Sequence, residues 1–292
     1  MRGMSSLVIA CALACAGPVL AADTDADTLK AFIGKLHLQS GTVTVPEAHA
    51  TLKLAPDFRY VGAHDAQNVL ENLWGNPPDS DVLGMILPEG EKSLTEENTW
   101  AVVLTYSDDG YVSDEEASKT DYVKMLKEMQ EGTRDSNEAR KKAGYDAVDL
   151  IGWAAAPRYD QAANKLYWAK ELKFGDNAEH TLNYDIRVLG RNGYLSMNAI
   201  SGMAQLPKVE AGMKQVLTMT EFDPGNRYAD FNKSTDKLAA YGIAALVGGT
   251  LAAKAGLFGK LLVILLAAKK FVLLGLVAVG AAVKGLFKKK SA

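Results

Sequence analysis

The segment TLNYDIRVLGRNGYLSMNAIS, residues 181–201, decides the fold. Alternating and β-branched residues predict two strands in it, 181–190 and 194–201. Asn192-Gly193 stands between them, and both residues accept the positive φ angles of a type I′ turn. This is the strongest hairpin signal in the sequence, so the domain is expected to contain antiparallel sheet.

Further strands and helices are predicted on both sides of this hairpin. The strands are expected at 41–45, 50–54, 58–62, 82–87, 99–106, 148–155 and 165–174. Amphipathic spacing predicts helices at 24–38, 64–74, 113–144 and 207–219. Gly132 is expected to break or bend the third helix. This order of elements indicates an α+β fold, with antiparallel sheet or sheets and packing helices.

Charge is divided unevenly along the chain. All 35 acidic residues lie between Asp23 and Asp236, and the 23 basic residues of 23–237 leave that region a net charge of −12. A domain with this charge repels nucleic acid and anionic lipid, so no nucleic-acid role is expected for it. After Lys237 the sequence has eight lysines and no acidic residue.

Residues 1–22 are typical of a secretory signal peptide. A basic start is followed by a short apolar run, and cleavage is expected after Ala21 or Ala22. An uncleaved anchor is the alternative, but the run is shorter than the roughly 20 residues that a membrane span needs. Both cysteines, Cys11 and Cys15, lie in this segment. Cleavage would exclude disulfides, thiolate catalysis and cysteine-based metal sites from the exported domain.

Residues 238–292 are predicted to anchor the domain, residues 23–237, to a membrane. The run 238–253 is uncharged, and extending it to Gly259 gives the length of a span. The next apolar stretch, 261–287, has a central Lys-Lys pair and makes a poor span. Two topologies compete: one span followed by a basic amphipathic helix at the interface, or a two-helix hairpin. The positive-inside bias favours the first, with the anchor in the bacterial inner membrane and the domain in the periplasm. The structural alternative, a helical hairpin buried in a soluble protein, suits a long stretch without acidic residues poorly.

No motif for a known catalytic or cofactor-binding site stands out. The four histidines are scattered without the spacing of a zinc site, and the acidic turn at 108–116 lacks the alternating ligands of a calcium loop. The sequence also lacks GxSxG, P-loop and GxGxxG patterns. We therefore expect neither a metal nor a cofactor.

Several aromatic and glycine-rich stretches carry a family resemblance. They are WGNPP (74–78), GWAAAPRYD (152–160), LYWAKEL (166–172), TLNY (181–184), LGRNG (189–193), GNRYADF (225–231) and DKLAAYG (236–242). From about Gly41 to the basic tail, the chain resembles bacterial membrane-anchored proteins grouped as domain of unknown function 2167. The resemblance implies an exported domain and a C-terminal membrane segment, and it implies no reaction. The architecture is also similar to the PsbP and Mog1 class of folds.

Seven residues of these motifs are candidates for a binding surface. A tryptophan with Arg, Tyr and Asp in a loop can hold a peptide or glycan by stacking and charge-assisted hydrogen bonds. The candidates are Trp74, Asn76, Trp153, Arg158, Tyr159, Asp160 and Arg227. The alternative is structural: Trp153 packs inward and Asp160 caps a turn at a strand end, with similar roles for the others.

Three functions compete on this basis. The first is a non-enzymatic interaction module that faces the periplasm, binds membrane lipid through residues 238–292 and has an envelope protein or glycan as partner. The second is an envelope hydrolase; its carboxylates would come from Asp57, Asp160, Asp185 or Glu171, and Arg158 or Arg227 would bind an anion. The third is a membrane-stress or transport accessory that acts through the Gly- and Lys-rich tail. Two carboxylates facing each other in a deep cleft would favour the hydrolase.

Overall fold

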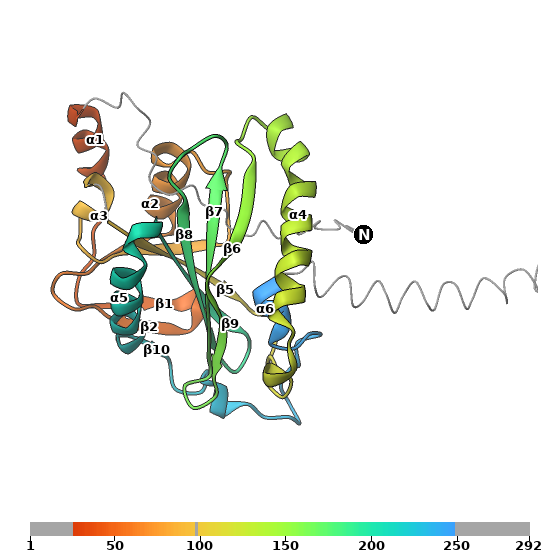
Figure 1. Cartoon of the computed structure of the whole chain (residues 1–292). Helices are drawn as coiled ribbons and strands as arrows, with labels where there is room; N and C mark the ends of the chain where they lie inside the picture. Colours follow the sequence, from red (N-terminus) through yellow and green to blue (C-terminus); the bar gives the residue numbers. More distant parts are fainter. Residues whose placement is uncertain (1–25, 97–98, 249–292) are drawn as a thin grey trace, which may run out of the picture. The chain divides into compact units, whose positions relative to one another are not determined.

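The predicted hairpin forms the centre of a large antiparallel sheet. The computed structural model describes residues 26–96 and 99–248 (Figure 1). In it, seven strands pair in the order β3-β4-β5-β9-β8-β7-β6. They are β3 (Arg59–Gly62), β4 (Val82–Leu87), β5 (Ala101–Ser107), β6 (Val148–Asp160), β7 (Lys165–Phe174), β8 (Thr181–Leu189) and β9 (Tyr194–Gly202).

A second, smaller sheet and a set of helices complete the domain. The small sheet has the order β1-β2-β10, with β1 (Thr42–Val45), β2 (Ala50–Lys53) and β10 (Thr220–Phe222). The helices are α1 (Ala26–Ile33), α2 (Ala63–Asn68), α3 (Lys92–Thr95), α4 (Tyr122–Lys142), α5 (Leu206–Met219) and α6 (Ala244–Gly248). Helix α2 continues into a π-helical turn, η2 (Val69–Leu73), and 3₁₀ turns form at η1 (Pro46–Ala48), η3 (Ala117–Lys119), η4 (Met203–Gln205) and η5 (Tyr228–Asp230). The α+β prediction is confirmed: antiparallel sheets are packed by helices.

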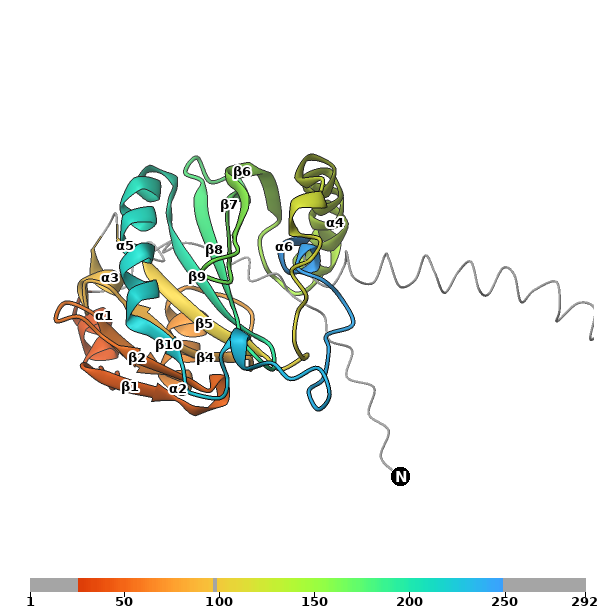
Figure 2. The same ribbon diagram turned by 90° about the horizontal axis from the view of Figure 1, so that it is seen from below.

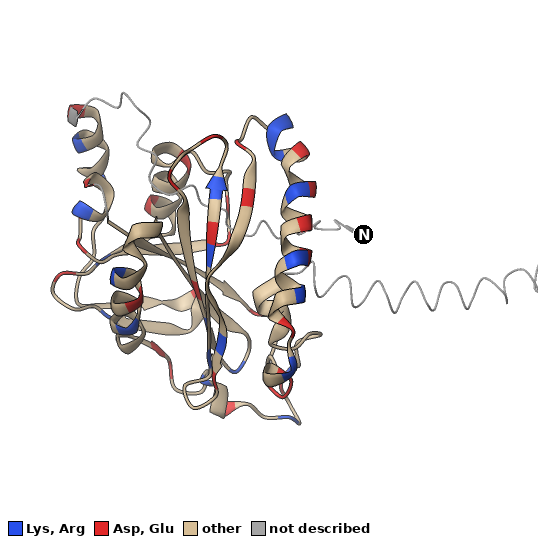
Figure 3. Cartoon of the chain, viewed as in Figure 1, with Lys and Arg blue, Asp and Glu red and all other residues tan. Residues whose placement is uncertain are grey.

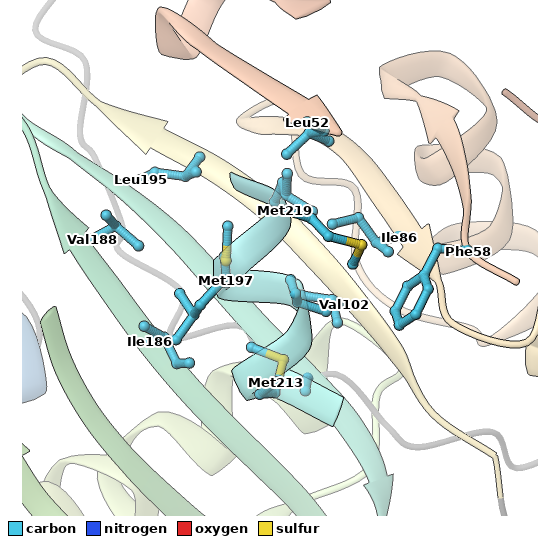
Figure 4. Packing of buried hydrophobic residues seen from close by; sticks show 14 of the residues in the cluster. Leu52, Phe58, Ile86, Val102, Ile186, Val188, Leu195, Met197, Met213 and Met219 are labelled. Carbon is cyan, nitrogen blue, oxygen red and sulfur yellow. The ribbon is translucent and has the colours of Figure 1, made fainter. Parts of the chain in front are cut away.

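Helix α5 and the small sheet cover one face of the large sheet, here called the α5 face. Alternation along the strands places one set of side chains on this face. Met213 and Met219 of α5 point toward Ile186 and Met197 of the sheet and toward Leu52 of β2 (Figure 4). All five side chains are buried in one continuous apolar core.

Helices α2 and α4 cover the opposite face, here called the α4 face, and lie over different strands. Near α2, an apolar cluster joins Val69 and Leu70 to Val103 and Ile200. Near α4, other clusters join the helix to β6, β7 and β8. Helices α4 and α5 therefore stand on opposite sides of the sheet (Figure 2).

Helix α4 differs from the prediction at its start and at Gly132. The helix begins after Asp121, whose carboxylate accepts hydrogen bonds from the amides of Val123 and Lys124 at 3.1 and 3.0 Å. The predicted break at Gly132 is wrong, because the helix is continuous. Side chains on both sides of Gly132 hold it to the edge of the sheet: Gln130 donates to Leu150 O and Ile151 O, and Asn137 bonds both backbone groups of Val148. Acidic and basic residues alternate along its outer surface (Figure 3).

The predicted hairpin forms, but the type I′ turn is wrong. Asn192 and Gly193 both have negative φ, and the amide of Gly190 bonds Gly193 O at 2.8 Å. Glycine is needed at 193 for a different reason. A Cβ atom there would lie 1.7 Å from the carbonyl oxygen of Ser107. The constraint is the close approach of β5, which no local turn pattern reveals.

The predicted leader and most of the predicted anchor fall outside the described residues. Among residues 26–96 and 99–248, no helix combines the length and apolar character that crossing a membrane requires.

Candidate functional site

The strand predicted at 148–155 continues to Asp160, so residues 156–160 are strand and not the loop that the binding hypothesis assumed. Its alternation sends neighbouring candidates to opposite faces of the sheet. Trp153 lies under α4, where its indole nitrogen donates to Tyr122 O at 3.2 Å. The hydroxyl of Tyr159 donates to Asp114 at 2.8 Å. Asp160 accepts hydrogen bonds from the amides of Ala162 and Ala163, each at 3.1 Å, and so caps the turn into β7.

Arg158 is the member of this group that points into solvent. Its guanidinium carbon lies 4.7 Å from the centre of the Tyr167 ring, on the α5 face. Tyr184 is the next aromatic side chain on that face. Burial raises its pKa, the charge of Glu210 raises it further, and a hydrogen bond from Arg158 opposes both. Arg158 and the half-buried Tyr167, together called the Arg158 surface, form a cationic and aromatic patch on the sheet, and Tyr184 lies buried beside them.

Trp74 and Asn76 lie in the interior. Trp74 is packed in the apolar cluster beneath α2. The backbone amides of both residues close the end of η2, by donating to Val69 O at 3.0 Å and to Leu70 O at 2.8 Å. Asn76 is buried as well. The two side chains therefore support the fold and leave no exposed surface for a partner.

Arg227 is exposed and belongs to a self-capped turn. The carboxylate of Asp230 accepts from the amides of Arg227 and Gly225, at 2.9 and 3.0 Å. Arg227 also pairs with Gly190 in an isolated antiparallel bridge. The turn thus docks a C-terminal segment, residues 223–248, on the β8–β9 hairpin. We call this segment the clasp.

An ion pair and stacked rings fasten the clasp. Arg191 makes two hydrogen bonds to Asp236, at 2.7 and 2.9 Å, and a third to Gly225 O at 3.0 Å. The bond from Arg191 holds the pKa of Asp236 far below its usual range. The Tyr111 ring stacks on Tyr228 and on Phe231, with ring centres 4.4 and 3.8 Å away.

The last part of the clasp, 238–248, is packed on the domain, although the sequence assigned it to the membrane anchor. Ile243, Leu246 and Val247 are buried beside α4 and the sheet, in the cluster that contains Trp168. The amide of Ile243 donates to Ser113 O at 3.1 Å. Residues 238–248 therefore belong to the folded domain, and the prediction that the membrane anchor starts at residue 238 is wrong for them. Residues 249–292 lie outside the described structure.

Three tyrosines at the clasp act as neutral hydrogen-bond donors. Burial raises the pKa of Tyr159, Tyr228 and Tyr241, and neighbouring acceptors raise it further. The acceptor is Asp114 for Tyr159 and Asp109 for Tyr241. Since these hydroxyls keep their protons, they are poor candidates for acid-base chemistry. Those of Tyr228 and Tyr241 join the clasp to the segment 109–112.

The four carboxylates of the hydrolase hypothesis have separate environments. Asp57 lines an open groove of 720 Å³ between β3, α3 and α5. Asp160 caps a turn, and Glu171 contacts His180 at 2.5 Å on the α5 face. Asp185 is buried on the α4 face between two cations. In the part of the chain that the structure covers, no three His, Asp or Glu side chains form a group that could hold a metal ion.

A buried group of charges on the α4 face went unpredicted. Lys170 Nζ lies 3.1 Å from Asp185 Oδ2, and Arg187 Nη1 lies 3.2 Å from Asp185 Oδ1. We call these three residues the ion cluster. Asn198 donates to the same carboxylate at 3.1 Å, and the Arg187 guanidinium carbon lies 4.8 Å from the centre of the Trp168 ring. The sequence shows polar residues at alternate positions of β7, β8 and β9, and these could have indicated the cluster. The strand register that brings them together could not be predicted from it.

Comparison with known families identifies the chain. A family model described as "Protein of unknown function (DUF2167)" matches residues 37–280. The chain belongs to the DUF2167 family. No curated protein sequence matches it.

Solved structures show distant likenesses to this DUF2167 chain. Cyanobacterial PsbP (CyanoP) from Synechocystis sp. PCC 6803 has 14% sequence identity, covers 63% of this chain and 92% of its own, and gives a TM-score of 0.35. The Ran-binding protein Mog1p from Saccharomyces cerevisiae has 10% identity, covers 68% of this chain and 100% of its own, and gives a TM-score of 0.32. At these values neither likeness bears on the function of the DUF2167 chain.

Five of the seven sequence stretches that carry the family resemblance gather in two places in the structure. The motifs 189–193, 225–231 and 236–242 build the clasp and its docking site. The motifs 166–172 and 181–184 lie in β7 and β8, where they supply Lys170 and its buried neighbours. The motif residues thus mark the α4 face and the clasp more than any exposed loop.

Proposed function

We propose that this chain is an exported interaction module that faces the periplasm, is held at the membrane by its lysine-rich C-terminal segment, and performs no catalysis of its own. The clasp is the observation that carries the proposal. It fastens residue 248, from which the lysine-rich segment continues, to the folded domain by an ion pair, stacked rings and buried apolar side chains. The segment that we propose to bind the membrane therefore continues from a fixed point on the domain.

The charge of the two regions supports the same arrangement. Residues 23–237 have a net charge of −12, and the sequence after them has eight lysines and no acidic residue. Each lysine near an anionic lipid surface contributes about 1 kcal/mol of attraction. The acidic domain is repelled by that surface and would face away from it.

The Arg158 surface supports a partner-binding role. Arginine and tyrosine dominate the energetics of many interfaces, because they combine broad contact area with directed hydrogen bonds. Here they stand on a sheet whose other face is packed, so the surface is preorganised. An envelope protein or glycan is the partner class that we propose.

Site-specific crosslinking in membranes tests this role. A photoreactive amino acid at the exposed position Ala156, beside Arg158, is expected to capture a defined partner from cells that express the full chain. The same probe at Ser136, exposed on α4, serves as the control. Arg158→Ala should abolish the adduct at 156, whereas Arg134→Ala on α4 should leave it. Equal adducts at both probe positions, or an adduct that Arg158→Ala leaves unchanged, would contradict the assignment of this surface.

Fractionation tests the membrane attachment separately. The full chain is expected in the membrane fraction, and a chain that ends at Gly248 is expected in the periplasmic fraction. Recovery of both chains in the same fraction would remove the attachment from the proposal and leave the crosslinking result to stand alone.

A further inference from the structure

The ion cluster carries an excess positive charge in the interior of the domain. Lys170 and Arg187 share the single carboxylate of Asp185. The Asp185 side chain is 4% exposed, whereas those of Lys170 and Arg187 are 11% and 16% exposed. The carboxylate therefore lies deepest, and both cations reach toward solvent at its edge.

An unbalanced buried charge is costly unless a counter-charge or hydrogen bonds compensate it. The neighbouring neutral groups of the α4 face do not supply a negative charge. Asn198 donates its amide to Asp185, and Trp168 presents its ring to Arg187. A small anion at the solvent edge would bring the cluster from a charge of +1 to neutrality.

The surrounding side chains suit an oxyanion. The indole nitrogen of Trp168 is buried and has no hydrogen-bond partner among the described residues, and the same holds for two buried oxygens at the cluster, Asp185 Oδ2 and Asn198 Oδ1. The oxyanion would therefore contact the indole and the two cations and keep away from these oxygens. Ser196 lies directly across from Arg187 in the strand register, and Thr105 lies across from Ser196, so two hydroxyls share that row with the guanidinium. Guanidinium, ammonium, indole N–H and hydroxyl groups are the donors that phosphate and carboxylate oxygens accept from.

We propose that the ion cluster is a binding site for a small oxyanion, a phosphate or carboxylate group, which bridges Lys170 and Arg187. Both cation heads lie within 3.2 Å of one carboxylate, so they are close enough together for one anion to contact both. The site lies on the α4 face, opposite the Arg158 surface, and does not depend on membrane attachment or on the proposed partner.

Titration of the full chain with inorganic phosphate tests the site. Phosphate is expected to raise the unfolding temperature and to change tryptophan fluorescence, because Arg187 lies against the Trp168 ring. Chloride at matched ionic strength should do neither. Acetate separates a carboxylate site from a phosphate site. A response to phosphate or acetate that chloride does not reproduce supports the proposal, and equal responses to all three salts would overturn it.

Charge variants give effects of opposite sign. Lys170→Met and Arg187→Gln each remove one charge-assisted contact and should weaken the anion response by about tenfold or more. Asp185→Asn raises the charge of the cluster to +2 and should strengthen it. Lys173→Met, on the same strand but on the opposite face, is the control and should respond like the wild type.

One further variant keeps the test decisive if a charge deletion prevents folding. Ser196→Asp adds a carboxylate directly across the strand register from Arg187, where it supplies the negative charge that the anion would otherwise bring. It leaves the hydrogen bond from Asn198 to Asp185 in place and should lose the anion response. A wild-type response in Ser196→Asp, or a weaker response in Asp185→Asn, would contradict the proposed site.

Discussion

The two faces of the large sheet are built on different principles. Where α5 and the small sheet cover it, the α5 face is lined by apolar side chains, and methionines of α5 fill the space between the sheets (Figure 4). The α4 face has separate apolar clusters under α2 and α4, and buried charges lie on the strands between them. Apolar side chains fill the covered part of one face, whereas the other face also buries Lys170, Asp185 and Arg187. The proposed oxyanion site accounts for these charges.

Loss of the clasp should have the largest effect on stability, because the clasp completes the α4 face. A chain that ends at Lys237 lacks buried Ile243, Leu246 and Val247. We expect it to lose about 4.5–9 kcal/mol of unfolding free energy, from about 1.5–3 kcal/mol for each of the three buried side chains. Urea unfolding monitored by circular dichroism measures this loss. A chain that ends at Gly248 is the matched control and should unfold like the full domain. Equal stability of the two truncations would show that 238–248 does not belong to the domain.

Substitutions at two adjacent residues of β8 allow the two faces to be compared directly. Asp185→Ala leaves Lys170 and Arg187 without their carboxylate and should cost about 3–5 kcal/mol, as for other broken buried ion pairs. Ile186→Ala, on the α5 face, should cost about 2–5 kcal/mol through the cavity it leaves.

Phosphate should distinguish the loss of stability in Asp185→Ala from that in Ile186→Ala. Phosphate should restore part of the stability of Asp185→Ala, because an anion replaces the missing charge, and should not restore that of Ile186→Ala. Denaturant titrations with and without phosphate give both values. Equal restoration in the two variants would assign the effect to general stabilisation by salt.

A smaller effect is expected where α5 approaches the sheet most closely. A Cβ atom at Gly212 would lie 2.1 Å from the buried ring of Trp100. Gly212→Ala should therefore cost about 1–3 kcal/mol by overpacking, although alanine favours helix. Gly132→Ala in α4 is the matched change in the other helix and should stabilise by about 0.5–1 kcal/mol. Thermal unfolding of both variants should show opposite signs, and a loss at both positions would mean that α4 also needs a glycine.

The sequence predicted the elements that local patterns govern. Strands 82–87 and 165–174 are found with the predicted bounds, because alternation and flanking breakers mark both ends. The elements α3 and β10 were missed, since four and three residues are too few to show a period. The candidate site depended on information that no local pattern holds. Ending the strand at 155, with a loop after it, placed Trp153 and Arg158 together at one strand end. The continuation of β6 instead sends Trp153 under α4 and Arg158 to the α5 face.

The ion cluster and the clasp were beyond local patterns for the same reason. Trp168, Asp185 and Asn198 lie side by side only through the register of three strands. Arg191 and Asp236 are 45 residues apart in the sequence. Sequence motifs marked both regions as important, but the contacts that give them a role come from the tertiary fold.

The smallest expected effect concerns pH and the α2 end of the α4 face. Burial opposes the ionisation of Asp65, but hydrogen bonds from the His37 amide and from the His64 and His37 rings outweigh it and lower the pKa. The His37 amide donates at 2.7 Å, and the two ring nitrogens lie 3.0 and 3.2 Å from the carboxylate. A carboxylate whose pKa is lower in the folded state stabilises the fold above its unfolded pKa, and this contribution is lost as the pH falls through the folded value.

Unfolding free energy should therefore decline toward acidic pH in the wild type and decline less steeply in Asp65→Asn. Asp57→Asn, at an exposed carboxylate in the open groove, is the control and should keep the wild-type slope. Parallel pH profiles for the wild type and Asp65→Asn would show that the two histidines do not hold Asp65 ionised.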